Sequence, residues 1–136
     1  MDTIEVIKNW IAKESEVLDL GCGDGEILSI LSSELGAITL GIEINQKDIN
    51  RCIQLGVNVI QQDIDGGLNN FSDKSFDTVI MSQTIQVLKE PKKALSEVTR
   101  IGKESIVTIP NFGFWSTRLS LLFSGKMPIT SSLPCL

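Results

Sequence analysis

The sequence predicts an α/β protein built on a doubly wound, mostly parallel sheet. Three observations carry this prediction. Five short apolar segments are typical of buried strands, segments of helical period lie between them, and a glycine-rich loop, Gly21–Gly25, follows the first apolar segment. Strands that alternate with helices pair in parallel, and helices then cover both faces of the sheet. Right-handed crossovers complete the doubly wound arrangement.

The N-terminal segment predicts a helix over 1–13. Asp2 can cap this helix, and Glu5 three residues later completes a capping box. Three isoleucines, with Trp10 beside them, form one apolar stripe at helical spacing.

Later helices are marked by capping residues. Gly36 is placed to end a helix that starts at Glu26. Asn45 can cap the next helix, which Gly56 closes. Pro91 suits the first turn of the last helix, and Gly102 ends it. The apolar segments between these helices predict strands over 16–21, 37–44, 57–63, 76–82 and 104–110, and 83–90 can hold a further short helix.

Composition excludes several classes of function. The chain of 136 residues fits a single domain over 1–136, and its net charge of −5 without a basic patch argues against nucleic-acid binding. Three widely spaced cysteines form neither a disulfide framework nor a zinc pattern, and reduced thiols fit a cytoplasmic protein. Neither a secretion signal nor an apolar run of about 20 residues is present, so we expect no membrane partner.

The glycine loop points to a ligand at the mouth of the first strand. A dinucleotide fingerprint needs a third glycine where Glu26 stands, and that carboxylate would repel a pyrophosphate. The Gly-Lys-Ser/Thr of a phosphate-binding P-loop is also absent. Backbone without side chains still permits close approach of a ligand. We therefore expect a ligand that needs no phosphate and can carry a positive charge.

Acidic residues close the first three strands. Asp19 lies beside the loop, Glu43 can accept both hydroxyls of a ribose, and Asp63 with Ile64 can bind the amine and face of a base. S-adenosylmethionine has the matching shape: a nucleoside with a cationic, amine-bearing tail. The alternative is a structural turn flanked by solvated strand-end caps, and the joint occurrence after three successive strands favours the nucleoside.

Several segments together resemble the MetW family of methionine biosynthesis proteins, a branch of the class I S-adenosylmethionine-dependent methyltransferases. They are VLDLGCGDGE, GIEI, VIQQDIDGGL, FDTVIMSQTIQVL and IPNFGFW, and the resemblance extends from about residue 16 to about residue 134. The glycine motif is common to the whole superfamily. The motifs at Asp63–Leu68, Ser82–Gln86 and Pro110–Trp115 are more specific to MetW-like proteins.

The resemblance implies a nucleoside-binding core over 16–110 with a Rossmann-like fold. It implies that the glycines line the methionine part of the cofactor, that Glu43 binds the ribose, and that Asp63 and Ile64 frame the adenine. The expected cofactor is S-adenosylmethionine or S-adenosylhomocysteine, with no metal. The predicted cofactor-binding residues are Asp19, Gly21, Cys22, Gly23, Gly25, Glu43, Ile44, Asp63, Ile64 and Ser82.

Catalytic residues remain unassigned. The loops after the fourth and fifth strands offer hydroxyl, amide and aromatic side chains, none of them a strong base, and the chain has no histidine. Many related methyltransferases have histidine where Gln86 stands, which argues against catalysis. Two hypotheses stay open. One is a regulatory or accessory partner of homoserine O-acetyltransferase, an enzyme with which MetW-like proteins are associated. The other is an active methyltransferase on a small acid or amine.

The C-terminal part departs from this family pattern: we expect a sheet that lacks the last two strands, followed by a tail over 111–136. Class I methyltransferases add a sixth strand and an antiparallel seventh. Here 114–123 predicts a short amphipathic helix instead. An unpaired fifth strand would be a sticky edge. Three explanations compete: the tail covers this edge, a second chain pairs with it in a homodimer, or the sequence is a fragment. We favour the fragment, because MetW-like chains continue beyond Leu133–Pro134.

Overall fold

The computed structural model describes residues 3–82, 87–108 and 120–123, and six strands form one sheet in the order β3-β2-β1-β4-β5-β6. All neighbours pair in parallel except β5 and β6, which are antiparallel. The strand order reverses between β1 and β4. The strands are β1 (Glu16–Leu20), β2 (Ile38–Glu43), β3 (Val59–Gln61), β4 (Phe76–Ser82), β5 (Gly102–Thr108) and β6 (Ser120–Phe123).

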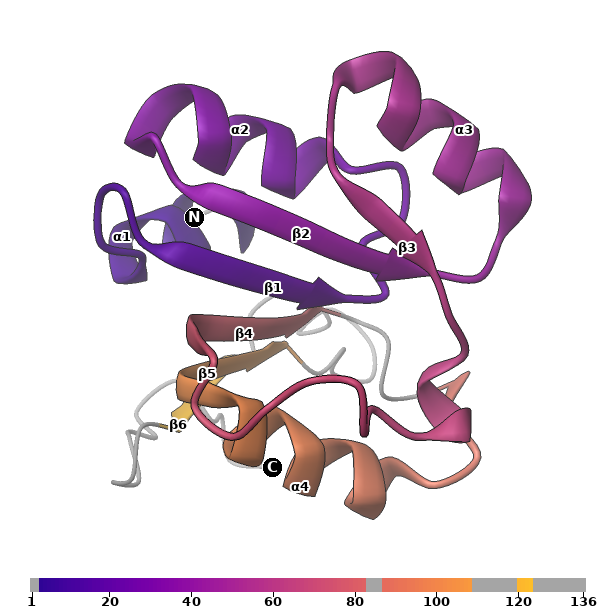
Figure 1. Ribbon diagram of the computed structural model, residues 1–136. Helices are drawn as coiled ribbons and strands as arrows, with labels where there is room; N and C mark the ends of the chain where they lie inside the picture. Colours follow the sequence, from indigo (N-terminus) through magenta and orange to yellow (C-terminus); the bar gives the residue numbers. More distant parts are fainter. Residues whose placement is uncertain (1–2, 83–86, 109–119, 124–136) are drawn as a thin grey trace, which may run out of the picture.

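Helices lie on both faces of this sheet (Figure 1). Three of them, α1, α2 and α3, cover one face, with α2 and α3 over β2 and β3, and α4 covers the other face under β4 and β5. This is the predicted doubly wound α/β arrangement. The helices are α1 (Thr3–Trp10), α2 (Glu26–Leu35), α3 (Gln46–Leu55) and α4 (Pro91–Ile101), with a 3-10 turn η1 (Ile64–Gly66).

Each face of the sheet has its own apolar core. On the first face, Ile7 of α1 and Leu28 of α2 are fully buried against strand residues such as Val17. On the second face, Val98 of α4 packs with strand residues such as Leu18. Because successive strand residues point to opposite faces, the two neighbours Val17 and Leu18 serve different cores. This is why the central strands are almost continuously apolar.

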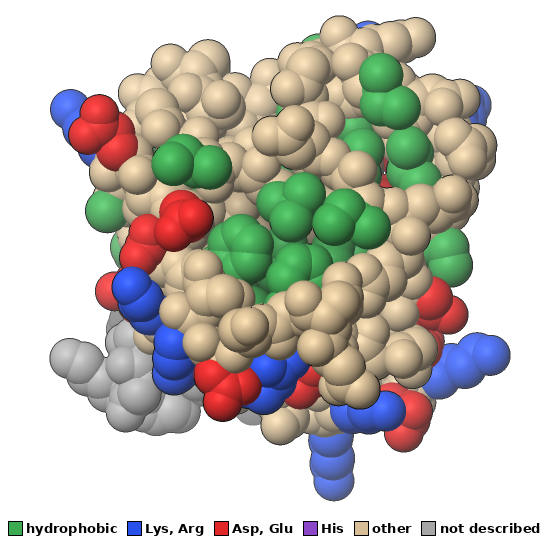
Figure 2. All heavy atoms as spheres, viewed as in Figure 1, with side chains coloured by type: hydrophobic (Ala, Val, Ile, Leu, Met, Phe, Trp, Pro, Cys, Tyr) green, Lys and Arg blue, Asp and Glu red, His purple; other side chains and the backbone are tan. Residues whose placement is uncertain are grey.

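Part of the second face has no helix over it. The connection between β3 and β4 contains only η1. Figure 2 shows apolar side chains gathered in this area, which is bounded by strands β1 and β2 on one side and by the loop that precedes β4 on the other. Ile38 is 61% exposed and Ile60 is 38% exposed. None of the described helices is long and apolar enough to cross a membrane.

The predicted helix ends are confirmed at three positions. Gly36 and Gly56 adopt the left-handed conformation with φ of 66° and 77°, and their N–H groups donate to carbonyls of the preceding turn. The side chain of Asn45 accepts the backbone N–H of Asp48 at 3.0 Å. Helix α1 begins at Thr3 among the described residues, and the predicted cap Asp2 lies outside them.

Gly102 ends the last helix as predicted, with its N–H donating to the carbonyl oxygen of Val98, and it also has a role that was not predicted. Helix α4 ends at Ile101, but Gly102 is extended, with φ of −97°, and begins β5. A Cβ atom there would lie 2.8 Å from Cγ2 of Val79 and 2.6 Å from the carbonyl oxygen of Glu104. Glycine is required at this position by close packing against β4, and no left-handed cap is formed.

The sheet continues beyond its fifth strand, contrary to the prediction. Strand β6 pairs antiparallel with Ser105–Thr108 of β5. The helix predicted over 114–123 is therefore wrong for 120–123, and 114–119 lie outside the described residues. Leucines at helical spacing also fit a strand, and pairing satisfies the backbone groups that an open edge would leave free. Of the three explanations, the structure supports a tail that covers this edge. The predicted homodimer through the fifth-strand edge would need Ser105–Thr108 of β5 to be unpaired.

Candidate functional site

A pocket of about 320 Å³ opens where the carboxyl ends of β1, β2 and β3 meet the segment after β4. In open α/β sheets, ligands bind at this edge, close to the point where strand order reverses. Five of the predicted residues line it, together with five that sequence reasoning did not name. The lining is Gly21, Glu43, Ile44, Asp63 and Ile64, with Ile42, Gln62, Asp65, Val87 and Leu88.

The glycine loop forms one wall of this pocket and has a backbone that only glycine adopts without strain. Gly21, Gly23 and Gly25 all have positive φ, at 81°, 59° and 85°. The N–H groups of Gly21 and Cys22 both donate to the carbonyl oxygen of Ile42, at 2.7 and 3.0 Å. The loop is thereby tied to the end of β2, where it brings bare backbone to the pocket.

Glu43 connects the loop to the far side of the pocket. One carboxylate oxygen accepts the N–H of Gly23 at 2.8 Å, and the other accepts the N–H groups of Ile44 and Asn45, each at 3.1 Å. A carboxylate offers about four lone-pair sites, so these three bonds leave room for at least one further donor. Glu43 therefore lines the pocket and also holds the glycine loop and the start of α3 in place. The sequence did not reveal this second, structural role.

Asp19 lies at the end of β1 with only 1% of its surface exposed. Its Oδ1 has no hydrogen-bond partner among the described residues. Burial, with a smaller contribution from the nearby Glu43 carboxylate, raises the pKa of Asp19 to about 7. A buried carboxyl oxygen without a partner is costly, which indicates that a cationic or donor group belongs beside it.

We expect Asp19→Asn to stabilise the protein at pH 8 and to have less effect near pH 5. The raised pKa means that the folded state holds the Asp19 proton while the unfolded state has lost it. The free energy of unfolding therefore falls as the pH rises from about 4 to about 7, and this fall is removed in the variant. Urea unfolding at pH 5, 6, 7 and 8 should show a difference from the wild type that increases by about 2–3 kcal/mol between pH 5 and pH 8. A difference independent of pH would contradict the assignment.

Two further acids act as caps in the pocket wall. Asp63 accepts the N–H of Asp65 at 3.0 Å and caps η1. Asp65 in turn accepts the N–H groups of Lys89 and Glu90, which joins the segment after β3 to the segment before α4. Both carboxylates still line the pocket, so their capping role coexists with an exposed acceptor surface.

Apolar side chains form the rim of the same pocket. Ile44 is 58% exposed and Val87 is 72% exposed, while Ile64 is half-buried. Exposed aliphatic side chains beside acceptors are suited to the flat face of a heterocycle whose edge carries donors. Val87 was not predicted, because its place in the pocket depends on the packing of the segment after β4.

Arg100 holds the loop that follows the site. Its guanidinium donates to the carbonyl oxygens of Leu68 and Phe71, at 2.9 and 2.8 Å, and to the carboxylates of Asp73 and Glu97, each at 2.8 Å. The hydrogen bonds that Arg100 donates to Glu97 and Asp73 raise its pKa above the usual range. This anchoring fixes the chain between β3 and β4, and with it the wall that carries Asp63.

The remaining predicted residues lie around the pocket and do not line it. The side chain of Cys22, within the loop, is buried. Gly25 is buried too and is the N-cap residue of α2. Ser82 ends β4 opposite Thr108 of β5, whose buried hydroxyl has no partner among the described residues. Gln83 and Gln86, and the aromatic residues after β5, lie outside the described residues. The assignment of these side chains to a cofactor stays a prediction.

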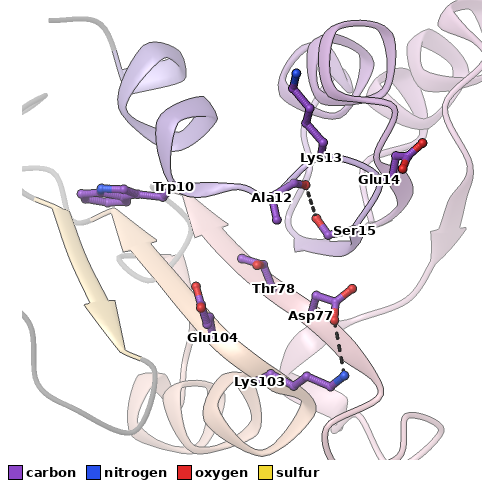
Figure 3. Close-up of a pocket in the computed structure, with 9 residues that line it drawn as sticks. All are labelled: Trp10, Ala12, Lys13, Glu14, Ser15, Asp77, Thr78, Lys103 and Glu104. Atoms are coloured by element: carbon purple, nitrogen blue, oxygen red, sulfur yellow. Dashed lines mark hydrogen bonds and ion pairs between the residues drawn. The ribbon is translucent and has the colours of Figure 1, made fainter.

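A larger cavity of about 440 Å³ lies at the opposite end of the sheet, at the amino ends of β1, β4 and β5 (Figure 3). Its polar groups already bond to each other: Asp77 accepts the backbone N–H of Glu16 at 2.8 Å and pairs with Lys103. The first of these bonds lowers the pKa of Asp77. We therefore place the functional site at the carboxyl edge. Among the described residues no cluster of histidine, cysteine or acidic side chains could hold a metal ion.

Comparisons with known proteins agree with this geometry. The model of the family described as "Methionine biosynthesis protein MetW" matches residues 1–136. A bifunctional methionine biosynthesis protein MetXA/MetW from Rhodopirellula baltica is 33% identical over 132 residues, which cover 91% of this chain and 21% of the relative.

Solved structures of S-adenosylmethionine-dependent methyltransferases share the fold. One from Archaeoglobus fulgidus is 28% identical with a TM-score of 0.68, covering 80% of this chain and 54% of that one. One from Thermotoga maritima is 26% identical with a TM-score of 0.68, covering 81% and 51%. The chain thus spans about a fifth of the curated relative and about half of these solved chains.

Proposed function

The chain belongs to the MetW family of methionine biosynthesis proteins, and we propose that it binds S-adenosylmethionine as a regulatory partner of homoserine O-acetyltransferase. The observation that carries the proposal is the pocket at the carboxyl edge, where a bare glycine loop, an acceptor carboxylate and exposed aliphatic side chains meet. S-adenosylhomocysteine, which has the same nucleoside, is expected to bind there too.

The side chains present fit this cofactor. Glu43 has acceptor capacity left for a ribose hydroxyl, and Asp63 with Ile64 would hold the adenine. The unpartnered Oδ1 of Asp19 suits the cationic end of the ligand beside the glycine loop. Without a ligand, the desolvation of this buried acid destabilises the protein. A cation bound beside the acid offsets that cost.

The region where a methyl acceptor would bind offers less support for catalysis. When bound, S-adenosylmethionine supplies an electrophilic methyl group. Transfer then needs a nucleophile aligned with it, and a base where that nucleophile carries a proton. The sequence contains no histidine, so no imidazole of this chain can serve as that base. A cofactor site without an imidazole base is suited to sensing the cofactor.

The name of the curated relative supports the partnership. That protein unites MetXA and MetW in one polypeptide, and the part aligned with this chain is about a fifth of it. Fusion gives two modules a high effective concentration, which is useful where they work together. A ligand that binds one state of the assembly better than another shifts its population, so cofactor binding here would tune the acetyltransferase.

An active methyltransferase is the second candidate, because the solved relatives at 26% and 28% identity are S-adenosylmethionine-dependent methyltransferases. The two candidates are separated by mixing the chain with homoserine O-acetyltransferase and methyl-labelled S-adenosylmethionine. Regulation predicts a cofactor-dependent change in acetyl transfer and no labelled product. Labelled metabolite would establish the methyltransferase. Unchanged acetyl transfer, with no association by sedimentation, would overturn the partnership.

A further inference from the structure

The geometry points to Cys22 and Cys52 as an oxidation site: we propose that the two thiols form a reversible disulfide that deforms the glycine loop. The described residues contain these two free cysteines, and they lie 30 positions apart in the sequence. The inference about the loop rests on the proposed function, because the loop is taken to hold the cofactor.

The two thiols already face each other. Their Sγ atoms are 3.8 Å apart, and Cys52 Sγ also donates to the carbonyl oxygen of Gly23 at 3.3 Å. Cys22 is 8% exposed and Cys52 is fully buried. An S–S bond is about 2.05 Å long, so closing the pair needs an approach of roughly 1.8 Å.

The loop is the part that can move. Cys52 is held in α3, and its carbonyl oxygen accepts the N–H groups of Gly56 and Val57 at the helix end. Cys22 instead stands between Gly21 and Gly23, whose positive φ values are available only to glycine. Backbone rotation at these two glycines is the least costly way to bring the sulfur atoms together.

This movement would change the proposed cofactor site. Gly23 donates its N–H to Glu43 at 2.8 Å, and Cys22 donates its own to Ile42 at 3.0 Å. Pulling Cys22 towards α3 strains both bonds and shifts the Gly21 wall of the pocket. We therefore expect the disulfide form to bind S-adenosylhomocysteine at least about tenfold more weakly, which is 1.4 kcal/mol.

The chemistry balances with a hydroperoxide as oxidant. The sulfur of Cys22, the more exposed thiol, takes one oxygen from hydrogen peroxide as the O–O bond breaks, and one water leaves. The Cys52 sulfur then displaces hydroxide from the resulting sulfenic acid, and the S–S bond forms with loss of a second water. Two thiols lose two electrons in total, and one peroxide gains them. A small dithiol reverses the step by exchange.

Burial sets the rate of this reaction. It raises the pKa of both thiols, more strongly for Cys22, so that the nucleophilic thiolate is scarce at pH 7. Its fraction increases about tenfold for each pH unit while the pH stays below the pKa. Oxidation should therefore be slow at pH 7 and markedly faster at pH 9. A ligand lying over the loop should slow it further.

The test uses the Cys135→Ser variant, so that only Cys22 and Cys52 remain. After treatment with hydrogen peroxide, intact mass spectrometry should show a loss of about 2 Da that dithiothreitol reverses, and peptide mapping should join the two cysteines. Cys52→Ser in the same background keeps a donor to Gly23 and should instead gain oxygen at Cys22. Calorimetry with S-adenosylhomocysteine should show the loss of affinity only where the disulfide forms.

The outcomes separate this inference from the proposed function. Oxygen added to each thiol without a 2 Da loss, in protein that stays folded, would overturn the disulfide. A disulfide that leaves the affinity unchanged would overturn its effect on the loop. Absence of binding by the fully reduced protein would contradict the proposed function, and the mass measurement would still decide the disulfide.

Discussion

Replacing Glu43 with alanine is expected to weaken binding of S-adenosylmethionine by about 1–3 kcal/mol, or roughly fivefold to 150-fold. The variant loses the proposed ribose acceptor and, with it, the three backbone hydrogen bonds that fix the glycine loop and the start of α3. Calorimetric titration of the wild type and the variant measures the difference directly, and urea unfolding shows how much stability is lost at the same time.

A modified ligand separates the two roles of Glu43. A 2′,3′-dideoxy analogue of S-adenosylhomocysteine should bind the wild type more weakly than the parent compound does. Against Glu43→Ala, the analogue and the parent should bind alike, because the acceptor is gone. Glu43→Gln keeps one acceptor oxygen and should fall between. Equal affinity of wild type and Glu43→Ala for the parent would mean that Glu43 is only a strand-end cap.

Gly41→Ala is expected to cause the largest loss of stability near the site, about 1–3 kcal/mol. Gly41 lies in β2 directly under the loop, where a new Cβ would overlap Sγ of Cys22 and come within 3.1 Å of Leu28 Cδ1. The sheet and α2 cannot move apart easily, so the loop would be displaced instead. Urea unfolding should show the loss, and ligand affinity should fall with it.

Gly66→Ala is the matched control. Its nearest neighbour would be 4.0 Å away and its φ is not positive, so its stability should stay within about 0.5 kcal/mol of the wild type. Adding Cys22→Ala to Gly41→Ala should restore part of the loss, because the overlapping sulfur is removed. A Gly41→Ala protein as stable as the wild type would contradict the close packing described for this loop.

The arrangement of strands and the position of the glycine loop could be predicted because they follow from local patterns. The strand over 76–82 and the caps at Gly36, Asn45 and Gly56 coincide with the structure. Each of these features depends on residues close together in the sequence. Their hydrophobic period predicts the strand, and their capping residues predict the helix ends.

Features that depend on packing between distant segments could not be predicted. Cys22 and Cys52 meet only because α3 packs over the loop, and a spacing of 30 residues gives no sign of it. The role of Gly102 comes from Val79 in another strand. Strand β6 was missed because its leucines also fit a helix, and only pairing with β5 decides between the two.

The account depends most directly on whether the pocket at the carboxyl edge binds an adenosyl ligand. Calorimetric titration of the reduced chain with S-adenosylmethionine and with S-adenosylhomocysteine measures this at pH 7.5. We predict saturable binding of one molecule of either compound for each chain. A folded chain that releases no heat with either ligand, and whose unfolding midpoint neither ligand raises, would contradict it.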